Sequence, residues 1–248
     1  MTHHYKGKFV ILDGLDGSGK GTCIEGLKEK LTDEGKKVFD LCRYWKDNKK
    51  DMDFNELKQY DVVITEEPTH IGIGKVIRDE MIADNGRKYS ARATAQAYAL
   101  DRLVLYSKVI LPLLNEGRTI IQSRSVSSSL TYQKLQSEEQ GEPLTLNEIV
   151  SMGGNIFALD NAPDLLIILS VRDVEKIIPR LKERDKKDNS IFEKLEFQKK
   201  LKGYYESEWF REIFEKRGTK LEYVYTDKSI EDSKEQVLKV YNNFMNNN

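Results

Sequence analysis

A glycine-rich segment near the N-terminus constrains what this chain can fold into more than any other feature. It reads Gly14-Leu15-Asp16-Gly17-Ser18-Gly19-Lys20-Gly21-Thr22. The apolar run 9–13 before it predicts a strand, and residues 23–31 after it carry apolar side chains at helical spacing. Glycines at such a turn let backbone N–H groups approach phosphate oxygens, while the helix N-terminus and the lysine add positive charge. We therefore expect a phosphate-binding loop between the first strand and the first helix.

The same alternation of short apolar runs and helical segments continues along the chain. Further strands are predicted at residues 62–65, 119–121, 165–169 and 223–225, and further helices at 91–114 and 230–244. Short apolar strands that alternate with helices indicate a parallel sheet covered on both faces. The expected fold class is therefore α/β, with a parallel sheet of about five strands, in a single domain spanning residues 1–248.

Composition argues against several classes of function. Lys and Arg number 40 against 41 Asp and Glu, so the net charge of −1 gives no general attraction to nucleic acid or to an anionic membrane. Cys23 and Cys42 are too few for a disulfide framework or a structural zinc site, which fits a reducing cytoplasm. The sequence has no signal-peptide core and no apolar run near the roughly 20 residues that span a bilayer. We expect a cytoplasmic protein whose anion site is local.

Two charge-dense segments interrupt the alternation. Residues 43–60 lie between the first helix and the second strand and are predicted to be a surface insertion. Residues 180–200 favour helix and are crowded with charge. For this second segment two interpretations stay open, a solvated helical face or a functional element.

Motifs beyond the glycine-rich loop resemble those of thymidylate kinases and occur in the same order. The Gly-Lys-Gly-Thr form of the loop is typical of nucleoside monophosphate kinases. The resemblance then rests on residues 65–69 followed by 73–78, on 98–102, on 123–133, and on 163–165 with 226–227. It covers nearly the whole chain apart from the insertion. It implies a three-layer P-loop kinase fold with a small mobile lid at 180–200. It also implies transfer of the γ-phosphoryl group of ATP to a deoxynucleoside monophosphate, with dTMP expected first, by an enzyme that is usually a homodimer.

Carried over residue by residue, the resemblance assigns roles to particular side chains. ATP binding falls on Gly14, Asp16, Gly17, Ser18, Gly19, Lys20, Gly21, Thr22, Arg180, Arg184 and Asp227. Acceptor binding falls on Asp16, Glu67, Tyr98, Arg102, Arg124, Ser129, Tyr132 and Gln133. The catalytic set is Lys20, Glu67, Arg124 and Arg184, with Arg180 and Arg184 as the lid cations. Asp16 and Glu67 are the candidates to hold Mg²⁺ directly or through water.

Physical reasoning supports three of the acceptor assignments. An acceptor nucleotide needs a flat partner for its base, a directed donor for the base edge and a cation for its phosphate, which matches Tyr98, Arg102 and Arg124. The structural alternatives are a core aromatic for Tyr98 and a surface ion pair for Arg102. Arg124 follows a predicted strand, and ligand sites form at the C-terminal edge of parallel sheets. An acceptor phosphate is already anionic, so catalysis needs positioning and charge neutralisation rather than a strong base.

Departures from the family pattern keep two other functions open. They are Gly21 for a serine or threonine, Glu66 for an arginine, Ser123 for an aspartate, Ser125 for an aromatic or histidine, and Asn189 for a lid arginine. Gly17 also replaces an arginine that one subgroup carries. Ser123-Arg124-Ser125 partly resembles the Glu-Arg-Ser of deoxynucleoside kinases, which phosphorylate a 5′-hydroxyl and need a carboxylate base such as Glu66 or Glu67. A nucleotide-binding protein without transfer activity is the third hypothesis.

Overall fold

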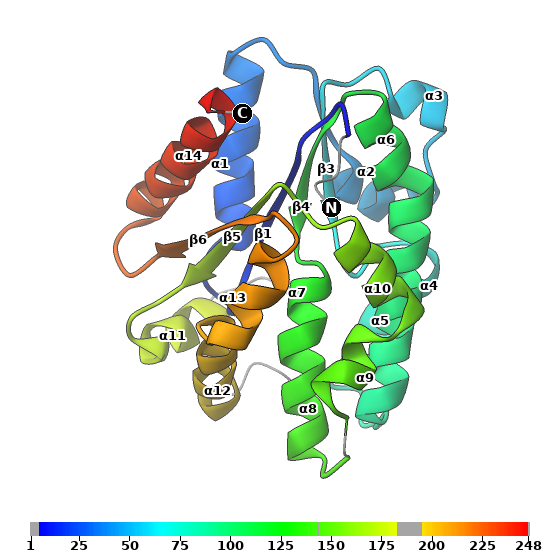
Figure 1. The fold of residues 1–248 in the computed structure, drawn as a ribbon, viewed down its shortest axis with the longest axis vertical. Coiled ribbons are helices and arrows are strands. Elements are labelled where there is room, and N and C mark those ends of the chain that lie inside the picture. The colour runs from blue at the N-terminus through cyan, green and yellow to red at the C-terminus, as the bar shows by residue number, and fades with distance from the viewer. Residues whose placement is uncertain (1–4, 143, 183–194, 248) are drawn as a thin grey trace.

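The computed structural model describes residues 5–142, 144–182 and 195–247, which fold around one six-stranded sheet (Figure 1). The strands are β1 (Phe9–Gly14), β2 (Val38–Asp40), β3 (Val62–Glu66), β4 (Thr119–Ser123), β5 (Leu165–Ser170) and β6 (Lys220–Tyr225). Their order is β2-β3-β4-β1-β5-β6, and all neighbours are parallel. The predicted α/β class is confirmed. The strand that the sequence missed is β2, because its three residues are only half-buried at the sheet edge and give a weak apolar signal.

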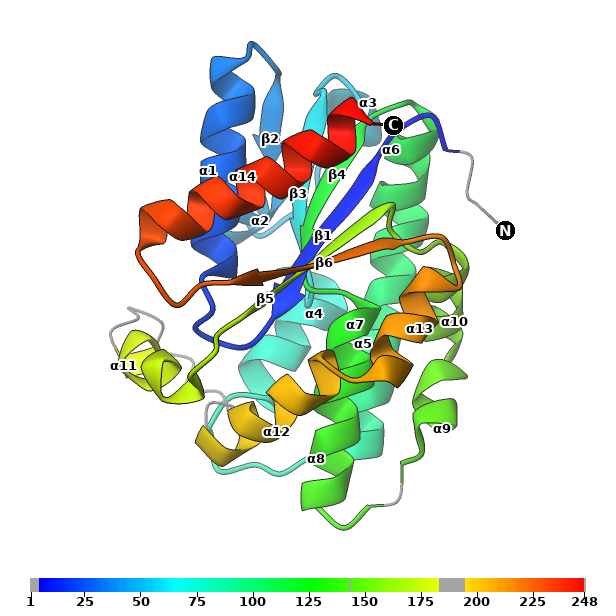
Figure 2. The same ribbon diagram turned by 60° about the vertical axis from the view of Figure 1, so that its left-hand side comes forward.

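Helices cover both faces of the sheet. On one face, α1 (Lys20–Asp33) and α14 (Ile230–Asn246) pack side by side (Figure 2). The other helices are α2 (Leu41–Asn48), α3 (Phe54–Leu57), α4 (Gly72–Val76), α5 (Ala91–Leu105), α6 (Leu111–Asn115), α7 (Val126–Ser128), α8 (Lys134–Glu139), α9 (Leu146–Val150), α10 (Gly153–Asp160), α11 (Ile177–Lys182), α12 (Leu195–Tyr205) and α13 (Glu208–Glu215). Shorter turns are η1 (Ile77–Met81), η2 (Tyr106–Ile110), η3 (Ser129–Gln133) and η4 (Val174–Lys176). In the described part of the chain, no helix combines the length and apolar character needed to cross a membrane.

Alternate residues of the central strands face the two helical layers. In β1, Phe9 and Ile11 belong to one buried cluster, and Val10 and Leu12 belong to the other. The first cluster includes residues of α5, α8, α10, α12 and α13, and the second includes residues of α1 and α14. Because both faces of β1 and β5 are buried, these strands read as uninterrupted apolar runs in the sequence.

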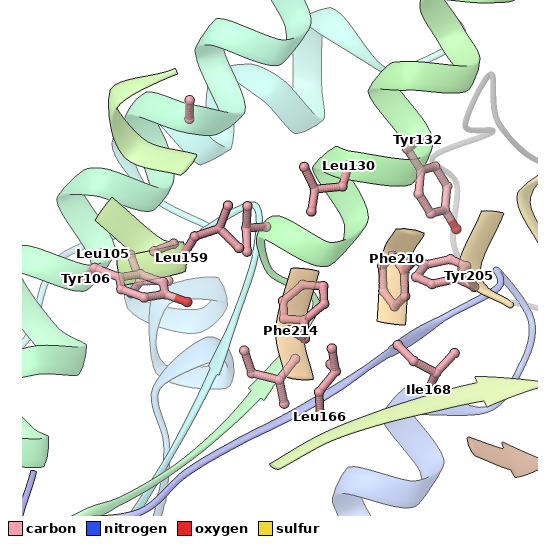
Figure 3. Packing of buried hydrophobic residues seen from close by; sticks show 14 of the residues in the cluster. Leu105, Tyr106, Leu130, Tyr132, Leu159, Leu166, Ile168, Tyr205, Phe210 and Phe214 are labelled. Carbon is pink, nitrogen blue, oxygen red and sulfur yellow. The ribbon is translucent and has the colours of Figure 1, made fainter. Parts of the chain in front are cut away.

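Aromatic side chains from α12 and α13 complete the core over β5. The ring centroids of Phe210 and Phe214 are 5.1 Å apart, and the ring of Tyr205 lies 5.3 Å from that of Phe210. Figure 3 shows these rings above Leu166 and Ile168 of β5. Helix α12 is therefore fixed to the centre of the fold.

Three predicted segments have a more detailed outcome. The predicted helix 91–114 is one continuous run of α5, η2 and α6. Segment 43–60 holds most of α2 and all of α3, and it contributes buried Trp45 and Leu57 to the core, so it is not purely a surface insertion. Of the predicted lid, residues 180–182 lie in α11 and 195–200 in α12, and the rest lies outside the described residues.

The C-terminal ends of three strands meet at one edge of the sheet. In the register of the sheet, Ser123 of β4 pairs with Leu12 of β1 on one side and with Glu66 of β3 on the other. The loops that follow these strands are therefore neighbours, at the edge where parallel sheets bind ligands.

Candidate active site

The glycine-rich segment forms a tight turn between β1 and α1. Gly14, Gly17 and Gly19 have φ angles of 124°, 74° and 91°, which glycine adopts without strain. A Cβ at Gly17 would lie 2.5 Å from a side-chain atom of α11, so a larger residue does not fit this backbone. Lys20 begins α1, and its Nζ donates to the carbonyl oxygens of Gly14 at 3.0 Å and Leu15 at 2.7 Å. The predicted loop is present, with its lysine buried against it.

A cavity of 560 Å³ lies beside this loop on the α14 side. Its lining residues are Gly17, Ser18, Gly19, Thr22, Cys23, Arg180, Thr226, Lys228, Ser229, Ile230 and Ser233. Nη2 of Arg180 donates to the carbonyl oxygen of Thr226 at 2.9 Å, which fixes Arg180 at the cavity. Asp227 is not among the lining residues, and its carboxylate instead accepts the backbone N–H of Arg172 at 2.9 Å. Arg184 lies outside the described residues.

A second cavity, of 80 Å³, contains the predicted acceptor residues. It is lined by Asp16, Glu66, Glu67, Pro68, Arg78, Ile82, Tyr98, Arg102, Arg124, Ser125, Ser128, Tyr132 and Gln133. Seven of the eight predicted acceptor residues line it, and the eighth, Ser129, contacts Arg102. Tyr98 is half-buried at this cavity rather than in the core. Ser129, Tyr132 and Gln133 all lie in the π-helical turn η3, and such turns occur frequently at functional sites.

Lys20 and Arg124 converge on a third cavity. This cavity has a volume of 380 Å³, and its lining also includes Gly21, Glu66 and Ser123. It shares Glu66 and Arg124 with the acceptor cavity. The two cations that the sequence predicts around the transferred group therefore face a common space.

Arg102 is held in place by three side chains. Its Nη2 lies 2.7 Å from Oε2 of Glu67 and 3.0 Å from Oγ of Ser129, and its Nη1 donates to Oδ1 of Asn155. Asn155 is itself fixed, because its Nδ2 donates to the carbonyl oxygen of Ile149 at 2.6 Å. Arg102 is 1 % exposed, so the surface ion-pair interpretation is wrong. The guanidinium is instead a buried, oriented group at the acceptor cavity.

Glu67 contributes the carboxyl group that pairs with Arg102. Its Oε1 accepts a hydrogen bond from Nε2 of Gln122 at 3.1 Å, while Oε2 forms the ion pair with Arg102. Burial raises the pKa of Glu67 to about 7, although the Arg102 guanidinium opposes the rise. The charge of this carboxyl group therefore changes near neutral pH.

Asp16 and Arg124 connect the glycine-rich loop to the loop after β4. Nη2 of Arg124 donates to Oδ1 of Asp16, and the hydroxyl of Tyr132 donates to Oδ2 at 2.9 Å. The Arg124 guanidinium also lies 5.0 Å from the centroid of the Tyr132 ring, as in a cation–π contact. Arg124 has a φ of 64°, which is uncommon for residues other than glycine and is found at functional sites more than elsewhere.

Glu66, which reverses a charge relative to the family pattern, is compensated by its neighbours. Its carboxylate lies 3.0 Å from Arg78, 3.2 Å from His70 and 3.7 Å from Lys46. Burial opposes ionisation, but the Arg78 guanidinium and these other groups hold the pKa of Glu66 well below its usual value. The negative charge of Glu66 is thus balanced by positive groups of the protein, one of which is Lys46 of the 43–60 segment.

The two predicted magnesium ligands are both engaged by protein groups. Glu67 binds Arg102 and Gln122 through its two oxygens, and Asp16 binds Arg124 and Tyr132. A guanidinium on a carboxylate oxygen competes with a metal ion for the same lone pairs. Within the described ranges there is no group of three or more His, Cys, Asp or Glu residues that could hold a metal ion. This arrangement does not fit direct coordination of magnesium by either carboxylate.

Sequence reasoning missed several residues that support the site. Asp13 is fully buried, and its carboxylate accepts hydrogen bonds from the hydroxyl groups of Ser128 at 2.9 Å and Tyr205 at 3.1 Å. Its signal was an acidic residue that ends an apolar strand. Asn155 and Gln198 are also fully buried, and they contact Arg102 and Asp16 respectively. Nothing local in the sequence marks either of them.

Comparisons with known proteins identify the family of this chain. The family model described as "Thymidylate kinase" matches residues 52–237. A "Probable thymidylate kinase" from Pyrococcus horikoshii is 34% identical over 205 residues, covering 81% of this chain and 82% of that protein. The "Thymidylate kinase" of Halothermothrix orenii is 31% identical over 176 residues, covering 71% of this chain and 69% of that protein. The solved structure of thymidylate kinase from Candida albicans has the same fold, with a TM-score of 0.66 at 22% identity, covering 99% and 96%. The chain belongs to the thymidylate kinase family.

Proposed function

We propose that this protein transfers the γ-phosphoryl group of ATP to dTMP, giving dTDP and ADP, as a transferase of nucleotide biosynthesis. The observation that carries the proposal is that consecutive residues of the glycine-rich loop line two different cavities. Gly17 lines the cavity beside the glycine-rich loop, and Asp16 lines the cavity that holds Tyr98, Arg102 and Arg124. Phosphoryl transfer requires donor and acceptor phosphates in line and in contact. Adjacent donor and acceptor sites meet this requirement. The identity of the acceptor, dTMP, is inferred from the family.

On the acceptor side, Arg124 is the proposed partner of the dTMP phosphate. Asp16 accepts from Nη2 of Arg124, and a guanidinium has five N–H donors, so an incoming phosphate would bind Arg124 beside Asp16. Arg102 would donate to the base edge from a guanidinium that Glu67 and Asn155 hold in one orientation. Tyr98 would supply the flat surface for the base. Preorganised donors of this kind lose little entropy on binding.

On the donor side, the phosphates of ATP are proposed to lie against the backbone of residues 14–22 and the N-terminus of α1. Lys20 would neutralise charge that moves onto the donor phosphates during transfer. The cavity beside Arg180 and Thr226 would take the rest of the nucleotide. Magnesium, which the family generally uses, would neutralise phosphate charge when it is bound. It would arrive with the phosphates of ATP, and contact with Asp16 through water stays a prediction.

The carboxylates argue against a deoxynucleoside kinase. That reaction needs a carboxylate able to accept a proton from a 5′-hydroxyl. Glu66 is paired with Arg78, and Glu67 is paired with Arg102. The Arg78 guanidinium holds the pKa of Glu66 well below its usual value and so keeps it a weak base, and both oxygens of Glu67 already accept hydrogen bonds, from Arg102 and Gln122. An already ionised phosphate acceptor needs no such base.

We also propose a homodimer, formed through the helical run 91–114 and its neighbour α4. Leu100 and Val104 on α5 are 50% and 40% exposed, and Val76 on α4 is 54% exposed. Helices α4 and α5 are in contact, and exposed large apolar side chains that form a patch are typical of interfaces. Analytical ultracentrifugation of the wild type and of Leu100→Asp tests this, and a wild-type monomer would contradict it. A cytoplasmic location likewise stays a prediction.

An assay with ATP and Mg²⁺ tests the proposed reaction. The acceptors are dTMP, thymidine and a panel of other nucleoside monophosphates, and the products are separated by ion-exchange chromatography. We expect dTDP and ADP from dTMP, and no phosphorylation of thymidine. Turnover of thymidine alone would identify a deoxynucleoside kinase. Turnover of no acceptor would identify a nucleotide-binding protein without transfer activity.

A further inference from the structure

A single buried side chain of helix α12, Gln198, holds both the backbone and the carboxylate of Asp16. Oε1 of Gln198 accepts the backbone N–H of Asp16 at 3.0 Å, and Nε2 donates to Oδ2 of the same residue at 3.1 Å. Gln198 is 0% exposed. A carboxamide supplies one acceptor and one donor for these two contacts, which neither a carboxylate nor an apolar side chain does.

The position of Gln198 is set by the packing of its own helix. Tyr205, the last residue of α12, donates its hydroxyl to Oδ1 of Asp13 at 3.1 Å and packs against Phe210 (Figure 3). Phe197, next to Gln198, is buried and lies with its ring centroid 6.0 Å from that of Tyr132. Anchors at both ends of α12 therefore fix the height of the amide relative to the glycine-rich loop.

We propose that Gln198 is a positioning residue for the transfer reaction, which sets the orientation of Asp16 and, through it, that of Arg124. Oδ2 of Asp16 accepts hydrogen bonds from the Tyr132 hydroxyl and the Gln198 amide, while Oδ1 accepts one from the Arg124 guanidinium. Two donors on one oxygen fix the rotation of the carboxylate about its side-chain bond, and this rotation decides where the Arg124 guanidinium rests. The inference rests on the proposed function, because Arg124 is the proposed partner of the acceptor phosphate.

Replacement by glutamate gives a reversible test. At high pH, Gln198→Glu keeps the shape of the side chain but loses the donor to Asp16 and places a second carboxylate beside it. When protonated, the same group has an O–H donor and a carbonyl acceptor, which restores both contacts. Burial and the Asp16 charge both favour protonation of the new carboxyl group. Gln198→Met removes both contacts at nearly the same volume, and Lys199→Gln, on an exposed position of α12, is the matched control.

The expected results separate positioning from a purely structural role. Gln198→Met should lower kcat for dTMP by about 10- to 100-fold, because a small misplacement of a positioning group costs about this much. Its KM should change less. The kcat of Gln198→Glu relative to wild type should be lowest near about pH 9 and rise as the pH falls toward about 6. Lys199→Gln should match wild type throughout. A wild-type kcat in Gln198→Met, or a Gln198→Glu ratio independent of pH, would overturn the inference.

Two further readouts keep the test decisive. Circular dichroism and thermal unfolding establish that each variant is folded; if Gln198→Met is not, the pH dependence of Gln198→Glu decides. If the wild type does not phosphorylate dTMP, the proposed function fails by itself. The affinity for dTMP, whose phosphate is the proposed partner of Arg124, is measured by calorimetric titration and then takes the place of kcat. An affinity of Gln198→Glu that approaches that of wild type as the pH falls would support the positioning role. A ratio of the two affinities that does not change with pH would refute it.

Discussion

Nη2 of Arg102 lies 2.7 Å from Oε2 of Glu67, and the two side chains are 1% and 2% exposed. The pair joins helix α5, which also holds Tyr98, to the loop that follows β3. A charge at this depth is costly unless it has a partner. The same contact therefore bears on the stability of the fold and on the proposed recognition of the acceptor.

Arg102→Met is expected to lower the free energy of unfolding by about 3–5 kcal/mol, because it leaves the Glu67 carboxylate buried without its partner. Urea unfolding followed by circular dichroism at pH above about 8 measures the change, so that Glu67 starts ionised. The double variant Arg102→Met, Glu67→Gln should recover part of the loss. Gln96→Met, at an exposed position of α5, should change stability by less than about 0.5 kcal/mol. Equal stability of Arg102→Met and wild type would show that the pair is not buried as described.

Glu67 should give stability a specific dependence on pH. Its pKa is about 7 in the folded protein against an ordinary value of 4.5, so the folded state holds the proton more tightly. The stabilisation from this proton is complete below the unfolded pKa and is lost as the pH rises through the folded pKa. Wild type should therefore lose stability relative to Glu67→Gln between pH 4.5 and 7. Calorimetric Tm values of both proteins across this window measure the effect, which a constant difference would rule out.

Lys20→Met should reduce kcat by about 10²- to 10³-fold, since it removes the cation that is proposed to neutralise charge on the donor phosphates. Calorimetric titration should still detect dTMP binding, because Lys20 does not line the acceptor cavity. Lys30→Met, further along α1 and 45% exposed, is the control and should leave both properties unchanged. Wild-type turnover by Lys20→Met would refute the assigned role of the glycine-rich loop.

Arg124→Lys tests the proposed contact with the acceptor phosphate. The variant keeps the charge but loses the planar guanidinium, so the KM for dTMP should rise about tenfold. Thymidine has no phosphate, and its inhibition constant should change much less. Steady-state kinetics with dTMP as substrate and thymidine as inhibitor provide both numbers. Equal effects on the two ligands would indicate that Arg124 acts only through the shape of the cavity.

Two neighbouring glycines at the start of α10 provide a matched pair. A Cβ at Gly154 would lie 1.7 Å from the carbonyl oxygen of Ala99, whereas one at Gly153 would meet no atom of the described residues within 4 Å. Gly154→Ala should therefore destabilise the protein by about 1–3 kcal/mol or more. Gly153→Ala should be neutral or stabilising by about 0.5–1 kcal/mol. Thermal and urea unfolding compare them, and similar effects would contradict the close packing of α10 on α5.

Several features could be predicted because their signals are local. Glycines at fixed offsets between an apolar run and a helix predicted the loop at 14–22, since the turn needs those positive φ angles. Apolar runs predicted β1 and β5 within one residue at each end, because both strands are buried on both faces. The edge strand β2 escaped prediction, as its residues are few and half-buried.

The sequence by itself determined the glycine-rich loop and five of the six strands, and its family resemblance pointed to seven of the residues that line the acceptor cavity. Tertiary structure alone decided which of those residues pair. Gln198 and Asp16 are separated by 182 positions, and Asn155 and Arg102 by 53, yet each pair is in direct contact. Such contacts arise from the packing of whole helices on a sheet, and no local pattern of side chains encodes the distance between two packed helices. For this reason the loop with Lys20 could be predicted from its glycines, whereas the amide that holds its aspartate could be found only in the folded chain.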